Sequence, residues 1–307
     1  MINQYIYEYL SNIVGQENRL FEKETECCTY IKKKLEKLGI NYTSQTYETF
    51  YPRFLDRGLS VDSISLECYP CSFSSWVITE NNTFDSLKIK ESYRPWICFN
   101  SASDFLSIPN IYYAPTLAIA QSDKKILHNG DLIKWFVNVK RERFIGENII
   151  VWNIENPKKI VMCHYDSRFS GACDNAIWVA VLLYILPDIL KSNMVVFSGS
   201  EEVSYEQPYR WCGYRKCENT FLKQFNIADE IIILDSFGYW KNIVYTEPSL
   251  IKSAYWTLHY DFLSKSKVYS SEIGKLMEIY HSKDDTIDKI NNIDIDEIIW
   301  IISQIPL

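Results

Sequence analysis

Histidines and carboxylates recur in this sequence at the points where short apolar runs stop. His164 follows the run KIVMC, Asp235 follows IIIL, and His281 follows LMEIY. The pair Glu201 and Glu202 stands just past the run MVVF. In an open α/β sheet the strand ends line the crevice where ligands bind. Imidazole and carboxylate together form a donor set that suits Zn²⁺ or a similar divalent ion. The pattern therefore predicts a metal site in a hydrolase.

Taken singly, each of these residues has a simpler explanation. Asp174, ten residues after His164, could cap the apolar helix that follows it, and Asp166 could be a turn carboxylate. Asp235 is harder to dismiss, because a buried carboxylate without a partner is costly. The joint arrangement favours a built site, and three of the ten glycines lie within three residues of its carboxylates: Gly171, Gly199 and Gly238.

The elements that must position these residues follow from the hydrophobic pattern. NIIVWNI, KIVMC, NMVVFS and EIIIL are nearly continuous apolar runs, which is typical of strands covered on both faces. A long apolar helix over 175–190 lies between two of them. We expect an α/β fold with a mixed, mostly parallel central sheet and helices on both faces. Helical periodicity also predicts two amphipathic helices before residue 39 and a terminal helix with its apolar face over 295–302.

Residues 51–144 differ in character from the rest of the chain. They are dense in Tyr, Trp, Ser and Pro, and short β-like runs alternate with turns. The sequence predicts a β-rich inserted domain there, which would divide a catalytic domain into residues 1–50 and 145–307.

Composition excludes several classes of function. With 47% hydrophobic and 23% charged residues the chain is that of a folded globular protein, and a net charge of -7 does not favour nucleic acid as a partner. The best apolar run ends at Pro187 and is too short for a membrane span, and no signal peptide is visible, so we expect a cytoplasmic protein. HExxH, GxGxxG, P-loop and GxSxG motifs are absent, which argues against zincins, nucleotide-binding enzymes and serine hydrolases. The nine cysteines are expected to be buried thiols or to form one or two disulfides.

The chain resembles the M28 family of metallopeptidases, the di-zinc aminopeptidases. The matching motifs are HYDS (164–167), GACDNA (171–176), GSEE (199–202), ILDSFG (233–238) and YHSKDDTID (280–288), in the family's order. The resemblance covers residues 1–50 and 145–307. The interposed segment is similar to a protease-associated insert, mainly through YYAPTLAIAQSD (112–123).

The resemblance implies a role for each matching residue. Two divalent ions, Zn²⁺ first and Co²⁺ or Mn²⁺ as alternatives, would be bridged by one carboxylate, with a neighbouring glutamate as general base. The implied metal ligands are His164, Asp174, Glu202, Asp235 and His281, and the implied catalytic residues are Glu201 as base, Asp166 as the group that orients His164, and Tyr269 as a candidate oxyanion stabiliser.

The sequence also departs from the family pattern. Ile177 and Trp178 stand where small residues usually follow the Asp-Asn pair, and the segment after Glu202 is long and aromatic. These changes concern the substrate pocket and leave the metal set complete. We expect a metallo-aminopeptidase that acts on peptides, without nucleic acid or membrane as a partner, and we leave a homo-oligomer open. The alternatives are a glutaminyl-cyclase-like acyltransferase with a single zinc, a carboxypeptidase on the same scaffold, and a catalytically inactive relative.

Overall fold

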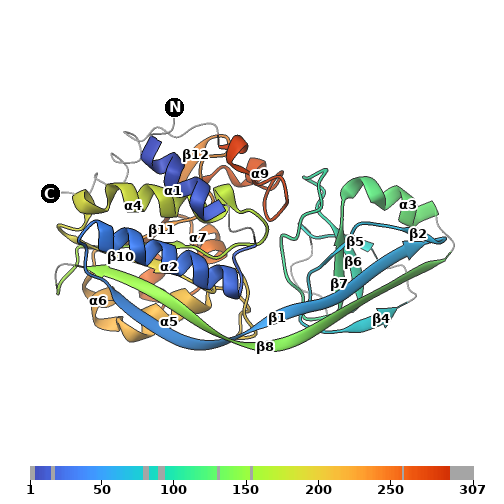
Figure 1. Ribbon diagram of the computed structural model, residues 1–307, viewed down its shortest axis with the longest axis horizontal. Coiled ribbons are helices and arrows are strands. Elements are labelled where there is room, and N and C mark those ends of the chain that lie inside the picture. The colour runs from blue at the N-terminus through green and yellow to red at the C-terminus, as the bar shows by residue number, and fades with distance from the viewer. Residues whose placement is uncertain are drawn as a thin grey trace.

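The chain folds into two lobes joined by a long two-stranded ribbon (Figure 1). The computed structural model describes residues 4–14, 18–78, 83–88, 94–129, 132–152, 155–257 and 259–290. The ribbon consists of β1 (Thr43–Val61) and β8 (Ile133–Trp152), which pair antiparallel from Thr43↔Ile150 to Val61↔Ile133 with an irregularity at Phe54/Asp56. We call residues 54–139 the second lobe and the rest the main lobe.

The central sheet lies mostly in the main lobe, and its strands are ordered β12-β13-β11-β9-β10-β8-β1-β2, with β4 pairing with β8; β2 and β4 are parts of the second lobe. Its central strands pair in parallel, and they are β13 (Ser266–Ser271), β11 (Glu230–Leu234), β9 (Lys159–His164) and β10 (Asn193–Ser198). The flanking strands pair antiparallel, and they are β12 (Asn242–Tyr245), β8, β1, β2 (Ile64–Ser65) and β4 (Trp76–Ile78). The expected α/β fold is confirmed, with the parallel pairing confined to the centre of a mixed sheet.

Both faces of the central strands are buried, which explains why their sequences are continuously apolar. Alternate residues of β9 point to opposite sides: Val161 and Cys163 belong to one core cluster, Ile160 and Met162 to the other. The first cluster is covered by α1 (Gln4–Val14), α2 (Glu22–Lys37) and α4 (Ile177–Ile189). The second is covered by α5 (Cys212–Thr220), α6 (Leu222–Ile227), α7 (Pro248–Ala254) and α8 (Tyr260–Ser264). This is the two-sided covering that the sequence predicts.

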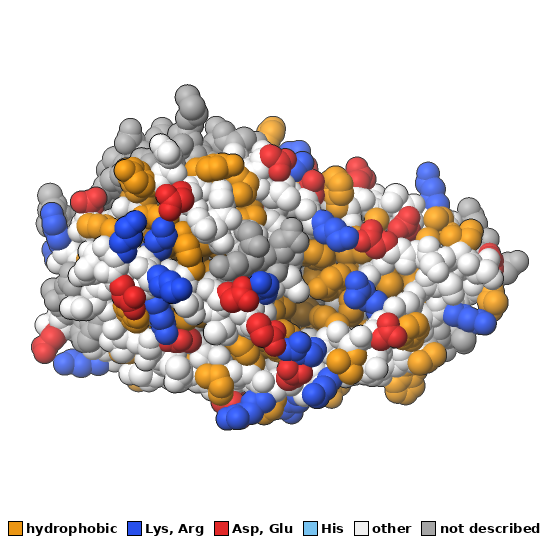
Figure 2. Space-filling view, viewed as in Figure 1, with side chains coloured by type: hydrophobic (Ala, Val, Ile, Leu, Met, Phe, Trp, Pro, Cys, Tyr) orange, Lys and Arg blue, Asp and Glu red, His pale blue; other side chains and the backbone are white. Residues whose placement is uncertain are grey.

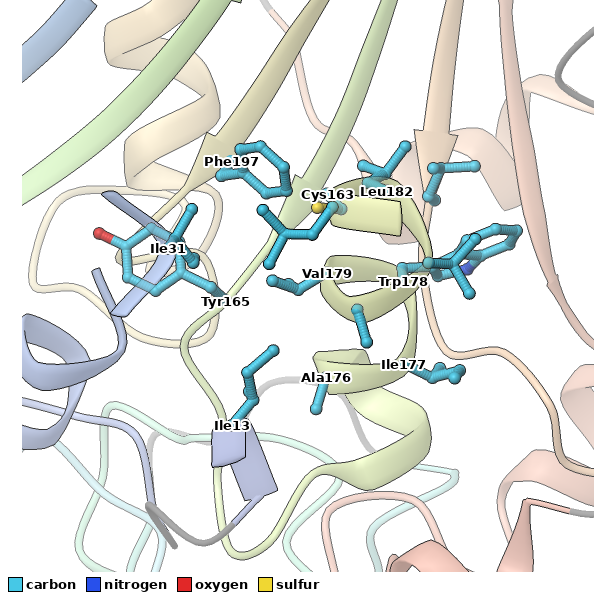
Figure 3. Close-up of a cluster of buried hydrophobic side chains, with 14 of the residues drawn as sticks. Ile13, Ile31, Cys163, Tyr165, Ala176, Ile177, Trp178, Val179, Leu182 and Phe197 are labelled. Carbon is cyan, nitrogen blue, oxygen red and sulfur yellow. The ribbon is translucent and has the colours of Figure 1, made fainter. Parts of the chain in front are cut away.

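Helix α4 is the most deeply buried helix of the main lobe's first core cluster. It follows an irregular turn, η2 (Ala172–Ala176), and packs among side chains of α1, α2, β9 and β10 (Figure 3). The Trp178 ring lies against Phe237, with ring centroids 4.2 Å apart. Within the described residues, Ala172–Ile189 is long and apolar enough to cross a membrane by composition, and 83% of it is buried inside the fold. Its burial between helices and sheet is that of a core helix.

The second lobe has its own four-stranded sheet, ordered β3-β7-β6-β5. Its remaining elements are β3 (Tyr69–Pro70), β5 (Thr83–Asp85), β6 (Trp96–Phe99), β7 (Thr116–Ile119), η1 (Gln121–Asp123) and α3 (Lys124–Asn129). The domain boundaries expected at residues 51 and 144 fall within β1 and β8, because both strands continue from one lobe into the other. On the face shown in Figure 2, basic and acidic side chains are interspersed over both lobes.

The chain after α8 returns to the strand ends through β13 and the short helix α9 (Ile273–Leu276), and its last described element is η3 (Ile287–Lys289). The terminal helix expected over 295–302 lies outside the described residues. All nine cysteines are buried and none is bridged to another, the closest contact being 3.5 Å between Cys71 Sγ and Cys98 Sγ.

Candidate metal centre

The predicted ligands meet at one edge of the central sheet. His164 is the last residue of β9, Asp235 directly follows β11, and Glu201 and Glu202 follow β10. The carboxyl ends of parallel strands lie on the same edge, so these side chains converge. Asp174 reaches them from η2 and is joined to Asn175 by a cis peptide bond. His281 arrives from the chain that follows α9.

Asp174 lies between the two histidines. Its Oδ1 is 3.1 Å from His164 Nε2, and its Oδ2 is 3.1 Å from His281 Nε2. Each histidine has a further carboxylate on its other side: Asp235 Oδ1 lies 3.6 Å from His164 Nε2, and Glu202 Oε2 lies 2.9 Å from His281 Nε2. The arrangement is two imidazole–carboxylate pairs that share one aspartate.

The donor set fits bound zinc on three observations. Two groups of potential ligand atoms, His164–Asp174–Asp235 and Asp174–Glu202–His281, each lie within 4.8 Å of one another. Asp174, Glu201 and Glu202 are almost completely buried and the Asp235 side chain is 18% exposed, and packing so many acids together is unfavourable unless cations compensate them. Asp174 Oδ2 is buried and accepts no hydrogen bond of good geometry, which leaves it available as a ligand atom.

Glu201 stands beside both groups. It lies within 4.8 Å of donor atoms of His164 and Glu202, and its side chain is buried. Burial raises its pKa well above the usual range, against the lowering effect of His164, and the neighbouring Glu202 raises it further. A carboxyl group in this environment can both accept and hold a proton.

The pKa values of His164 and Asp174 shift in the directions expected for an imidazole beside carboxylates. Burial would lower the pKa of His164, but Glu201 and the hydrogen-bonded aspartates raise it well above its ordinary value. Burial alone would raise the pKa of Asp174, but the two histidines hold it well below the usual range. A metal ion would therefore have to displace a proton from the His164 imidazole when it binds.

Asp166 connects the two halves of the cluster. Its main-chain oxygen lies 3.0 Å from His164 Nδ1 and its Oδ1 lies 3.6 Å from the same atom, while its Oδ2 accepts a hydrogen bond of 2.9 Å from the Glu202 amide. The Nδ1 contact leaves His164 Nε2 directed at Asp174 and Asp235. The structure thus brings Asp166 next to His164, as the sequence predicts.

Two glycines allow the close packing of this edge. Gly171 has φ +57°, and a Cβ there would meet Asp174 O at 2.3 Å. A Cβ on Gly199 would meet Glu24 Oε1 at 2.3 Å and Tyr165 Oη at 2.7 Å. Both positions need glycine because neighbouring groups fill the space.

Tyr269 is the one predicted site residue that the structure does not place in the cluster. Its ring packs against the core beneath α4, and its hydroxyl is influenced by Glu230, at the opposite end of β11. Only its main chain contacts the site, where its carbonyl accepts a 3.1 Å hydrogen bond from the Asp235 amide. The tyrosine beside the cluster is Tyr280, whose ring stacks on His281 at 3.7 Å between centroids.

Sequence reasoning missed the groups that hold the loops of the site. Arg19 is fully buried and donates to three main-chain oxygens of the loop after β9, at 2.7 Å to Tyr165, 2.6 Å to Ser170 and 3.0 Å to Gly171. Asp285 accepts from the amides of Cys173 and Asp174 at 2.7 and 3.1 Å. The YHSKDDTID motif contains Asp285, so that residue could have been found, whereas no spacing signals Arg19.

Two further arginines lie beside the ligands. Arg168 Nε is 3.4 Å from Glu202 Oε2, and its Nη2 donates to the Glu202 carbonyl. Arg210 donates to Pro109 O at 2.8 Å, and its charge acts on Tyr280, Glu202 and Glu201. Arg168 follows the HYDS motif and Arg210 lies in the segment after GSEE, but the residues that they contact include Ile108 and Pro109, which are distant in the chain.

No protein-family model and no curated protein matches this sequence. Solved structures match it over nearly the whole chain at low identity. A zinc aminopeptidase from Bacillus subtilis superposes with a TM-score of 0.68 at 14% identity, covering 96% of this chain and 92% of that one. A Peptidase M28 precursor from Shewanella amazonensis has a TM-score of 0.64 at 13% identity, covering 94% and 89%. A glutaminyl cyclase from Porphyromonas gingivalis has a TM-score of 0.52 at 15% identity, covering 98% and 97%. The chain therefore has the fold of the zinc-dependent exopeptidases.

Proposed function

We propose that the protein is a zinc-dependent aminopeptidase that holds two ions and releases the N-terminal residue of peptides. The observation that carries the proposal is the position of Asp174, with one oxygen facing each histidine. His164 and Asp235 would complete one ion's ligands, and Glu202 and His281 the other's. The similarity to zinc aminopeptidases of the same fold supports it.

The ions would supply an acidified water and stabilise negative charge on the substrate carbonyl oxygen. Glu201 would take the proton of that water and pass it to the departing amine. Its burial next to Glu202 suits it to this work, because a raised pKa lets the carboxyl group hold the proton between the two transfers. Asp166 would keep the His164 ring in place throughout.

A glutaminyl-cyclase-like activity is the first alternative, since that enzyme class shares the fold. It would use a single zinc. The second alternative, a carboxypeptidase, would need a cation for the terminal carboxylate of its substrate, and Arg210 is such a group beside Glu201 and Glu202. The complete donor set around both histidines favours a two-ion peptidase over the single-zinc cyclase.

Metal analysis combined with substrate assays tests the three. The purified protein, loaded with zinc and dialysed, should retain two equivalents and hydrolyse leucyl-p-nitroanilide. One equivalent together with cyclisation of an N-terminal glutaminyl peptide would favour the cyclase. Cleavage that requires a free C-terminal carboxylate, and that acts on N-acetylated peptides, would favour the carboxypeptidase. Retention of no zinc would overturn all three.

A further inference from the structure

Among the residues that the structure describes, the second lobe contacts the metal cluster at the His281 half. Ile108, in the loop after β6, lies against His281 through both of its main-chain polar groups. Its amide donates to His281 O at 3.0 Å, and its carbonyl oxygen lies 3.1 Å from His281 Nδ1. Ser107 and Ser282 form an isolated antiparallel bridge beside this contact. The loop thus pairs with the segment that carries the histidine.

The Ile108 carbonyl determines which nitrogen of His281 carries a proton. Arg168 Nη1 also donates to this oxygen, at 2.9 Å, and lies 3.3 Å from His281 Nδ1. An arginine nitrogen can only donate, and a carbonyl oxygen can accept twice. The consistent assignment is that Nδ1–H and Nη1–H both point at Ile108 O. His281 Nε2 is then the nitrogen free to face Asp174 and Glu202.

The loop is itself held by buried side chains. Asn100 Nδ2 donates to Ser107 Oγ at 3.0 Å and to Met277 O at 2.9 Å, and Ser107 Oγ donates to Tyr280 O at 2.8 Å. Asn100 and Ser107 are fully buried. These bonds fix the position of Ile108 relative to His281, because they join its loop to the chain just before the histidine.

The other half of the cluster is supported from within the main lobe. His164 Nδ1 contacts Asp166 O, and Asp235 Oδ1 accepts a 2.9 Å hydrogen bond from Ser236 Oγ. On the Glu202 side, Arg168 links the ligand to the second lobe, because it contacts Glu202 and the Ile108 carbonyl at once. The support of the two halves is therefore unequal.

We infer that the loop at 100–108 of the second lobe, together with Arg168, positions the ligands of one metal subsite, the one formed by Glu202 and His281, and leaves the His164–Asp235 subsite independent. These are positioning residues. Groups that orient a ligating histidine from behind typically contribute 10–100-fold to metal affinity. The inference rests on the proposed two-ion site.

Stepwise zinc affinity of the full-length chain tests this, measured for zinc alone by competition with a chromophoric chelator. Ser107→Ala and Asn100→Ala should each weaken one of the two zinc equivalents by about 10–100-fold and leave the other unchanged. Arg168→Met should do the same, and Arg168→Lys should restore part of the loss because it keeps a donor near Ile108 O. Tyr205→Phe is the matched control. It removes a 2.8 Å hydrogen bond from the main lobe to Phe73 O of the second lobe, and this bond does not involve His281.

The thermal midpoint of each metal-free variant reports whether it folds, and Ser107→Ala, which removes only a hydroxyl, is the mildest change. Equal weakening of both equivalents in a folded variant, or no weakening at all, would overturn the inference. A wild-type protein that binds fewer than two equivalents would instead overturn the proposed function. The two failures are thereby distinguishable.

Discussion

At the scale of single residues, the site separates the proposed metal ligands from the proposed general base. Glu201 is buried beside His164 and Glu202, yet it is not part of the two groups centred on Asp174. Its raised pKa follows from burial and from the neighbouring acid. A residue with this position can be removed without dismantling the ligand sets.

Glu201→Gln should therefore lower kcat by about 10²–10⁴-fold, the usual contribution of a general base, while zinc content stays at the wild-type value. Glu206→Gln is the matched control. Glu206 lies on the same loop, and its Oε2 pairs with Lys216 Nζ at a distance of 3.1 Å instead of facing the ligands. Steady-state kinetics on leucyl-p-nitroanilide and metal analysis of the same samples check both. Near-normal turnover in Glu201→Gln would remove it from the base role.

Asp174 differs from the other ligands because both histidines face it. Asp174→Ala should cost both zinc equivalents, whereas Asp235→Ala should weaken one. Asp188 is an exposed aspartate near the end of α4, and Asp188→Ala should retain both equivalents. Zinc content after dialysis against a weak chelator measures the difference. Two full equivalents in Asp174→Ala would contradict the bridging position.

At the scale of elements, the sequence predicted most of what lies in regular structure. The runs KIVMC, NMVVFS and EIIIL became β9, β10 and β11 because a strand covered on both faces must be apolar throughout. Since the ligands follow those runs directly, the strand ends and the site were predictable together. The role of Tyr269 as oxyanion stabiliser came from the resemblance and not from a strand end, and the structure packs its side chain against the core instead.

What the sequence did not reveal are contacts between segments far apart in the chain. Arg19 binds carbonyls more than a hundred residues away, and Arg168 joins Glu202 to Ile108. Neither arginine lies in a periodic pattern, and a buried guanidinium is recognisable only when its acceptors are known. His281 also has φ +49°, an uncommon backbone conformation that no sequence pattern signals.

Helix α4 positions Asp174, and its packing is measurable. Trp178 is fully buried against Phe237, and its Nε1–H has no hydrogen-bond partner. Trp178→Ala should lower the free energy of unfolding by about 3–5 kcal/mol, because it leaves a large cavity. Trp178→Phe should cost less, since it fills part of the space and loses no hydrogen bond. Denaturant titration checks both, with the exposed Trp76→Ala as the control that should change little. Equal losses in the alanine and phenylalanine variants would contradict the packing argument.

Helix α5 carries a buried acid remote from the ligands. Glu218 accepts hydrogen bonds from Tyr255 Oη and Thr257 Oγ1, and burial raises its pKa above the ordinary value, against these bonds. Between its unfolded and folded pKa values the native state binds more protons than the unfolded state. The free energy of unfolding should therefore fall as pH rises through that window.

Glu218→Gln should remove this part of the pH dependence, since an amide does not titrate in that range. Urea titrations from pH 4 upward should show a flatter dependence of stability on pH for the variant than for the wild type. A parallel dependence for the two proteins would mean that Glu218 titrates normally. The difference in thermal midpoint between the two proteins should be smallest near pH 4, because there the carboxyl group is mostly protonated in both states.

At the scale of the whole molecule, the two lobes share strands, but each has large core clusters of its own. The core clusters on the two faces of the main sheet contain no residue between 54 and 139. The second lobe has two core clusters of its own, and only Phe169 of the main lobe joins one of them. The large cores of the two lobes are thus separate, although β1 and β8 run through both lobes. A small cluster joins the lobes, since Phe73 of the second lobe packs with Tyr51 and Val203 of the main lobe.

This separation makes the expected insert testable by removal. Arg53 and Lys140 are direct partners across the ribbon, so an Asn-Gly turn can join them in place of residues 54–139. The shortened chain should fold, because both faces of its main sheet keep their cores. It should bind one zinc as the full chain does, through His164 and Asp235, and the second much more weakly, since Ile108 no longer supports His281. Thermal unfolding followed by circular dichroism shows whether the shortened chain folds, and zinc titration shows how many ions it binds and how tightly. A shortened chain that is unfolded would show that the lobes form one cooperative unit, whereas a folded chain that binds both ions tightly would show that His281 needs no support from the second lobe.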